Sequence, residues 1–76
     1  MIKFSEMIAL DRDLFFDDVL MDMCGELDLD WWQVVEDDER LCQLDERVAR
    51  AAGISVDELL TIPQYLRFVN TLIADI

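Results

Sequence analysis

The chain has 76 residues, 54% of them hydrophobic, and its eighteen acidic and six basic side chains give a net charge of −12. This length allows one domain, residues 1–76, with a thin core, because so small a domain hides only about 60% of the surface that its unfolded chain exposes. The negative charge argues against direct binding to nucleic acid or to anionic membranes.

The cellular location is expected to be cytoplasmic. No stretch reaches the roughly 20 apolar residues that cross a bilayer, and the first residues do not have the layout of an export signal. Cys24 and Cys42 are therefore expected to be reduced and partly buried, because disulfides are rare in the cytoplasm.

The hydrophobic spacing is helical throughout and predicts an all-α fold, a small bundle of four or five short helices. Residues 1–10 form either a short helix or an irregular lead-in. The next helix is expected over residues 14–24, with Asp11 or Asp13 as its N-cap and Gly25 at its end.

This helix is expected to have two different faces. Its outer face mixes acidic residues with two apolar ones, Leu14 and Met21. Its core-facing side carries the larger apolar set, at the helical spacing of one buried face: Phe15, Phe16, Val19, Leu20 and Met23.

A further helical piece is predicted from Trp31 to about Glu36, with Asp28 or Asp30 as its N-cap. It either runs into the following helix or bends at residues 37–38. That following helix is predicted over residues 39–52.

The end of the chain carries clear helix boundaries. Gly53 suits a left-handed C-terminal cap, and residues 55–58, SVDE, fit a capping box that opens a short helix ending near Leu60. Thr61 is predicted to cap the last helix, with Pro63 in its first turn. One apolar stripe follows along that helix: Tyr65, Phe68, Val69, Leu72, Ile73 and Ile76.

The residues that usually carry chemistry are scarce. The chain has no histidine, no glycine-rich phosphate loop and no zinc-binding set. Glu26, Asp28 and Asp30 are spaced like the start of a calcium loop, but Trp31 and Asp37 stand where that loop needs glycine and glutamate. We therefore expect no enzyme, no metal site and no cofactor.

The charge is concentrated in one half. Residues 1–39 hold thirteen acidic and two basic side chains, a balance of −11, whereas residues 40–76 hold five and four, a balance of −1. Such a field either keeps the protein soluble or attracts a basic partner. Because its self-repulsion works against the fold, we favour the second interpretation.

Two adjacent tryptophans, Trp31 and Trp32, lie inside the densest acidic run. Neighbouring helical positions point about 100° apart, so we expect one indole in the core and the other at the surface as an anchor for a partner. The predicted partner-binding residues are Leu14, Asp17, Asp18, Met21, Asp22, Asp28, Asp30, Trp31, Trp32, Glu36, Asp37 and Asp38.

Residues 27–36, LDLDWWQVVE, resemble the phosphopantetheine segment of acyl carrier proteins, whose usual run is Leu-Gly-Leu-Asp-Ser-Leu-Asp-x-Val-Glu. The short capped helix and the last helix are also similar to the end of that acidic helical family. Trp31 stands where the family has the serine that carries the prosthetic arm. The distance from the motif to the capped helix also departs from the family. The resemblance thus implies a docking domain that carries no prosthetic group.

The sequence favours a small acidic module that occupies a basic surface of a partner protein, with a nucleic-acid-binding protein as the expected partner. In its most concrete form the module is a DNA mimic, an inhibitor of the phage anti-defence type. An immunity or antitoxin protein, which neutralises a basic toxin, would use the same attraction between opposite charges. The alternatives are the carrier-like docking domain and a homodimer formed through leftover apolar surface.

Overall fold

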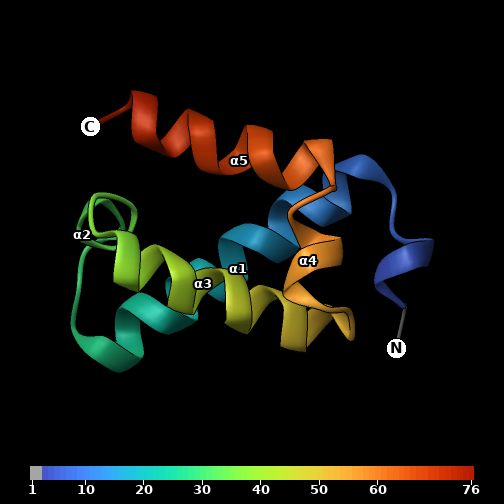
Figure 1. Ribbon diagram of the computed structural model, residues 1–76, viewed down its shortest axis with the longest axis horizontal. Helices are drawn as coiled ribbons and strands as arrows, with labels where there is room; N and C mark the ends of the chain where they lie inside the picture. Colours follow the sequence, from blue (N-terminus) through green and yellow to red (C-terminus); the bar gives the residue numbers. More distant parts are fainter. Residues whose placement is uncertain (1–2) are drawn as a thin grey trace.

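The computed structural model describes residues 3–76, which form five α-helices and one 3-10 turn and contain no strand. The predicted all-α bundle is therefore confirmed. The longest helix, α1, passes behind α3, and α2 and α4 lie at opposite ends of α3 (Figure 1). In chain order the elements are η1 (Phe4–Glu6), α1 (Ala9–Leu27), α2 (Trp31–Val35), α3 (Asp38–Ala52), α4 (Val56–Leu59) and α5 (Pro63–Ala74).

The lead-in is irregular apart from the 3-10 turn, and the predictions for residues 1 and 2 lie outside the described range. Helix α1 begins earlier than predicted, because Ile8 holds the N-cap position and both Asp11 and Asp13 lie inside the helix. The prediction that one of these two aspartates caps the helix was wrong.

Helix α1 also ends later than predicted. It runs through Gly25 and stops at Leu27, where Asp28 adopts a left-handed conformation (φ 55°) and the Leu29 amide donates to the Cys24 carbonyl at 2.9 Å. In this type of cap the residue after the left-handed one packs back on the helix. Leu29 does so against the core, whereas a cap at Gly25 would put the charged side chain of Glu26 in that place.

Of the two alternatives left open after α2, continuation or a bend, the structure has the bend. Asp30 holds the N-cap position of α2, and its amide donates to Gln33 Oε1 at 2.8 Å. Asp37 then starts α3, since its Oδ1 accepts hydrogen bonds from the amides of Glu39 and Arg40. A carboxylate that satisfies two unpaired amides of the first turn favours a new helix over continuation of the old one.

The last boundaries are mostly as predicted. Gly53 ends α3 with φ 74°, and Ser55 Oγ accepts from the Glu58 amide at 3.1 Å to start α4. The prediction for Thr61 was wrong, because Ile62 holds the N-cap position of α5 and Thr61 Oγ1 instead donates to the Glu58 carbonyl at 2.7 Å.

The centre of the core is aromatic. Phe16 of α1 is fully buried, and its ring lies 5.1 Å from that of Tyr65, 5.6 Å from Phe68 and 5.8 Å from Phe4. These distances are typical of favourable ring contacts. One cluster thus joins the N-terminal segment, α1 and α5. Only the first part of the predicted stripe is covered, however, because Ile73 on α5 and Ile76 beyond its end are exposed.

One polar contact crosses this core. The hydroxyl of Tyr65, which is fully buried, donates to Oδ1 of the half-buried Asp45 on α3. Burial raises the pKa of the Asp45 carboxyl, although the Tyr65 hydrogen bond opposes that change. Burial and the hydrogen bond to Asp45 both raise the pKa of the Tyr65 phenol. The hydrogen bond satisfies the hydroxyl of the buried Tyr65 and ties α5 to α3.

None of the helices between residues 3 and 76 combines the length and the apolar character needed to cross a membrane.

The two glycines give a matched test of the helix ends. Gly25 is exposed within α1 and an added Cβ would meet nothing within 4 Å, so Gly25→Ala should raise the free energy of unfolding by about 0.5–1 kcal/mol. Gly53→Ala should lower it by about 1 kcal/mol, because its positive φ strains an L-residue. Urea denaturation of both variants checks the opposite signs, and equal effects would contradict these assignments.

A second prediction concerns pH. In the folded protein the Tyr65 phenol stays protonated at pH values at which the phenol of the unfolded chain ionises. The free energy of unfolding should therefore fall as the pH rises above about 10. Tyr65→Phe should remove this component and cost about 1–2 kcal/mol at pH 7, because Asp45 loses its donor.

The measurement is urea denaturation of the unaltered protein and of the Tyr65→Phe variant between about pH 8 and pH 11. Burial also raises the pKa of the Cys24 thiol, which changes stability in the same direction in both proteins. The difference between the two profiles therefore isolates Tyr65, and parallel profiles would refute the prediction.

Candidate protein-binding surface

The outer side of α1 carries a row of exposed apolar side chains. Leu10, Leu14 and Met21 are 65%, 56% and 55% exposed, and at 100° per residue they lie within about 40° of one another around the helix. Gly25 continues the row toward the C-terminal end. The sequence prediction named Leu14 and Met21 but missed Leu10, because that residue was assigned to the lead-in. The four-residue spacing between Leu10 and Leu14, which places both on one side of a helix, could have identified it.

Acidic side chains flank this row on both sides. Asp17 lies along one edge, and Asp11, Asp18 and Asp22 lie along the other, all of them exposed. We call the surface formed by these residues the acidic face of α1; its members are Leu10, Asp11, Leu14, Asp17, Asp18, Met21 and Asp22. The opposite side of the same helix carries Phe16 and Met23, which are fully buried.

The tryptophans divide as expected. Trp31 is half-buried and packs against the core, whereas Trp32 is 40% exposed. Helix α2 packs against α1, α3 and α5, which fixes the direction of the exposed indole. Trp32 is therefore the candidate anchor, and Trp31 is a packing residue at the first position of α2.

The acidic residues at the two ends of α2 differ in their roles. Asp28 and Asp30, on the connection from α1, are exposed, and so are Glu36 at the end of α2 and Asp38 at the start of α3. Asp37 is half-buried and occupied by its two capping hydrogen bonds. We call the exposed set the α2 rim; its members are Asp28, Asp30, Trp32, Glu36 and Asp38.

All but two of the predicted partner-binding residues are thus exposed, the exceptions being Trp31 and Asp37. The structure places the exposed ones in two groups on different elements, the acidic face of α1 and the α2 rim. The three-residue connection from α1 to α2 joins these groups at the C-terminal end of α1.

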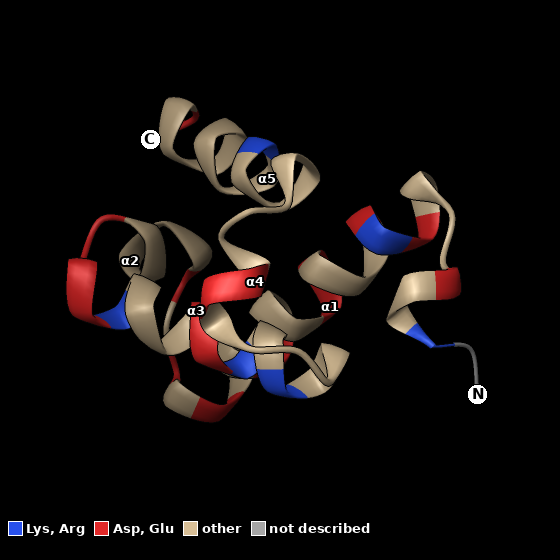
Figure 2. Ribbon diagram, turned by 45° about the vertical axis from the view of Figure 1, so that its right-hand side comes forward, with Lys and Arg blue, Asp and Glu red and all other residues tan. Residues whose placement is uncertain are grey.

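The acidic charge is almost entirely unpaired. Across residues 3–76 one ion pair forms, between Glu26 Oε2 and Arg47 Nη1 at 2.7 Å. Its hydrogen bond lowers the pKa of the Glu26 carboxyl. Acidic residues lie along α1, on the turn between α2 and α3, and on α3 and α4 (Figure 2). The members of the acidic face and the α2 rim have no cationic partner in the described chain, so their field is directed to solvent.

No other chemistry stands out in the described part of the chain. It contains no group of three or more carboxylate or cysteine side chains arranged to hold a metal ion. Cys24 is buried, and this burial raises the pKa of its thiol, with a further contribution from Asp30. Cys42 is exposed on α3, so the expectation that both thiols are partly buried was wrong for Cys42.

Comparison with known proteins found no match for this chain among protein-family models, curated proteins or solved structures.

The different roles of the two indoles can be tested by stability. Trp31→Ala should lower the free energy of unfolding by about 2 kcal/mol, because it removes a side chain that packs on the core. Trp32→Ala should change it by less than about 0.5 kcal/mol, because its indole is largely at the surface. Urea denaturation of the two variants measures this difference, and a larger loss for Trp32→Ala would reverse the assignment.

Proposed function

We propose that this protein is a small acidic binding module that occupies a basic surface of a partner protein. The observation that carries the proposal is the acidic face of α1, where exposed Leu14 and Met21 lie between unpaired aspartates. Burying such apolar side chains gives adhesion, and the surrounding charge speeds the encounter with a positively charged surface.

The charge selects among the possible occupants of this face. In a symmetric dimer formed through it, Asp17, Asp18 and Asp22 of one copy would face the same residues of the other. Like charges across an interface oppose association, and an anionic membrane would be repelled for the same reason. A surface rich in lysine and arginine is complementary to the aspartates, and an apolar groove on that surface is complementary to the apolar row on α1.

The specific form of the proposal is nucleic-acid mimicry. A basic surface built to bind phosphates also attracts rows of carboxylates, and the aspartates of α1 and of the α2 rim present such rows without neutralising partners. The module would then inhibit a nucleic-acid-binding protein by competition for the same surface.

The test begins with capture of partners from a lysate of the source organism at low salt, followed by elution with a salt gradient. The dissociation constant of the purified partner is then measured with a fluorophore on Cys42, which is the exposed thiol. Affinity should fall about tenfold or more between 0.05 and 0.5 M NaCl, because salt screens surface charges. Added duplex DNA should compete if the module is a mimic.

Charge-matched variants distinguish the contribution of the acidic face to binding from the contribution of the net charge. The triple variant Asp17→Asn, Asp18→Asn, Asp22→Asn should weaken binding about tenfold or more. The control Glu46→Gln, Asp57→Asn, Asp75→Asn removes the same number of charges from exposed positions elsewhere and should have a much smaller effect. Affinity that is independent of salt, or equal losses in both variants, would overturn the proposal.

A further inference from the structure

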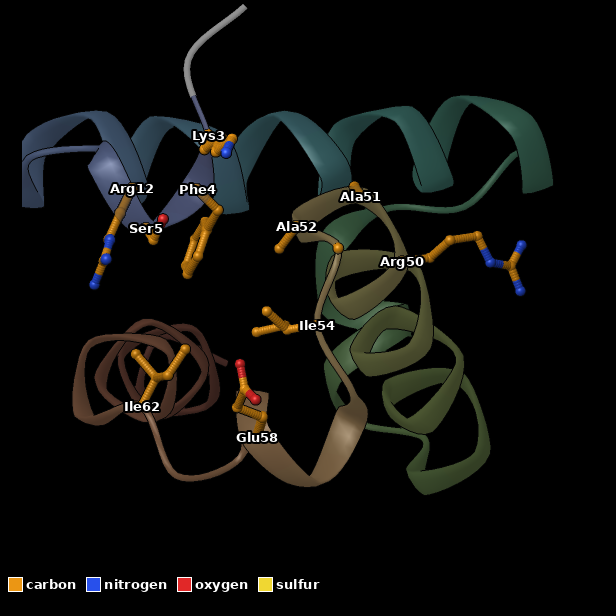
Figure 3. A pocket seen from close by; sticks show the side chains of 11 residues that line it. Lys3, Phe4, Ser5, Arg12, Arg50, Ala51, Ala52, Ile54, Glu58 and Ile62 are labelled. Carbon is orange, nitrogen blue, oxygen red and sulfur yellow. The ribbon is translucent and has the colours of Figure 1, made fainter.

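A second surface feature lies on the other side of α1. A hollow of about 610 Å³ is bounded by the N-terminal segment, α1, the end of α3 and the connections of α4 (Figure 3). Its apolar surface comes from Phe4, Ala52, Ile54 and Ile62. Both the volume and the apolar lining are within the range of small-molecule sites, about 300–1,000 Å³. Arg12, which also lines the hollow, lies about 180° around α1 from the apolar row of the acidic face.

Arg12 is the unusual group in this hollow. Its Cζ lies 4.6 Å from the centroid of the Phe4 ring, an arrangement that holds the guanidinium in place. Its Nε is buried and has no hydrogen-bond acceptor among the residues described. Although acidic residues outnumber basic ones threefold, no carboxylate of residues 3–76 lies within ion-pair distance of Arg12. A partly desolvated cation without an acceptor gains more from an anion than a fully hydrated one.

The other charged groups of the hollow set the position and charge of a ligand. Lys3 lies beside Phe4 on the same side as Arg12, whereas Arg50 points away from the hollow (Figure 3). Glu58 extends its carboxylate from the opposite wall, and no ion pair joins it to Arg12. An anionic group therefore belongs next to Arg12, with Lys3 at the rim of the hollow adding positive charge. A single negative charge meets the least repulsion from Glu58 and from the net charge of the chain.

We propose that this hollow binds a small organic monoanion, a carboxylate with a short apolar body. The carboxylate receives hydrogen bonds from the terminal nitrogens of Arg12, with Lys3 adding positive charge. The apolar body lies over Phe4, Ile54 and Ile62. This site is independent of the acidic face, because it uses the opposite side of α1 and the opposite sign of charge.

The experiment uses hexanoate and its neutral counterpart hexanamide as probes of equal length. Each is titrated into the ¹⁵N-labelled full chain, and backbone amide shifts are followed by NMR. Hexanoate should shift the amides of Phe4, Gly53 and Ile54, which border the hollow. Hexanamide should bind at least about fivefold more weakly, because it lacks the charge that Arg12 and Lys3 attract.

Four variants distinguish the contribution of the charges in the hollow to hexanoate binding from the contribution of the net charge. Arg12→Gln should weaken hexanoate binding about fivefold or more, whereas Arg67→Gln, which removes the same charge from exposed α5, should have little effect. Glu58→Gln should strengthen binding about twofold or more, whereas Glu46→Gln on α3 should not. The Glu58 change leaves the α4 cap intact, because that cap uses the Glu58 backbone amide.

Three outcomes would overturn the proposal. The first is an absence of hexanoate shifts around the hollow. The second is equal affinity for hexanoate and hexanamide, which would show that the charge is not used. The third is an effect of Glu58→Gln no larger than that of Glu46→Gln, and this result does not depend on how well Arg12→Gln folds.

Discussion

The packing of Phe16 is the constraint on which the rest of the molecule depends. Its ring is fully buried against aromatic rings from the N-terminal segment and α5, and the Tyr65 hydroxyl extends the same cluster to Asp45 on α3. Because the side of α1 that carries Phe16 faces the core, the opposite side of the helix faces solvent. Leu14 and Met21 must then face solvent, however apolar they are, because no element within residues 3–76 covers the other side of α1.

The charge distribution works against this small core. Unpaired carboxylates on α1 and around α2 repel one another, and a domain of this size has little hydrophobic stabilisation in reserve. Some acidic residues do contribute to the fold: Asp37 caps α3, Glu26 pairs with Arg47, and Asp45 accepts from Tyr65. The aspartates of the acidic face make no such contact. Their repulsion has no compensation inside the described chain, and a basic partner would supply it.

Helix α1 thus separates two kinds of surface. One side presents aspartates with an apolar row between them, and the opposite side presents Arg12 at the edge of an apolar hollow. The hollow forms where the end of α3, at the left-handed Gly53, turns the chain toward α4 and brings Ile54 to the same hollow as Phe4. The two proposed sites lie on different sides of α1 and use opposite signs of charge.

The sequence by itself determined the helical class, the C-terminal end of α3, the extent of α4, and the side of α1 that faces the core. These features depend on local spacing, on the left-handed glycine that ends α3, and on the Ser55 side chain, which bonds to a nearby amide. It also showed that the two indoles must diverge, since adjacent helical positions point in different directions.

Only the tertiary structure decided which indole is exposed, where α1 ends and what surrounds Arg12. Trp31 faces inward because α2 packs against three other helices. Helix α1 continues past Gly25 because Leu29, and not Glu26, can pack on the core after the cap. Arg12 meets Phe4 and the end of α3 through contacts between distant parts of the chain, and local sequence patterns do not encode such contacts.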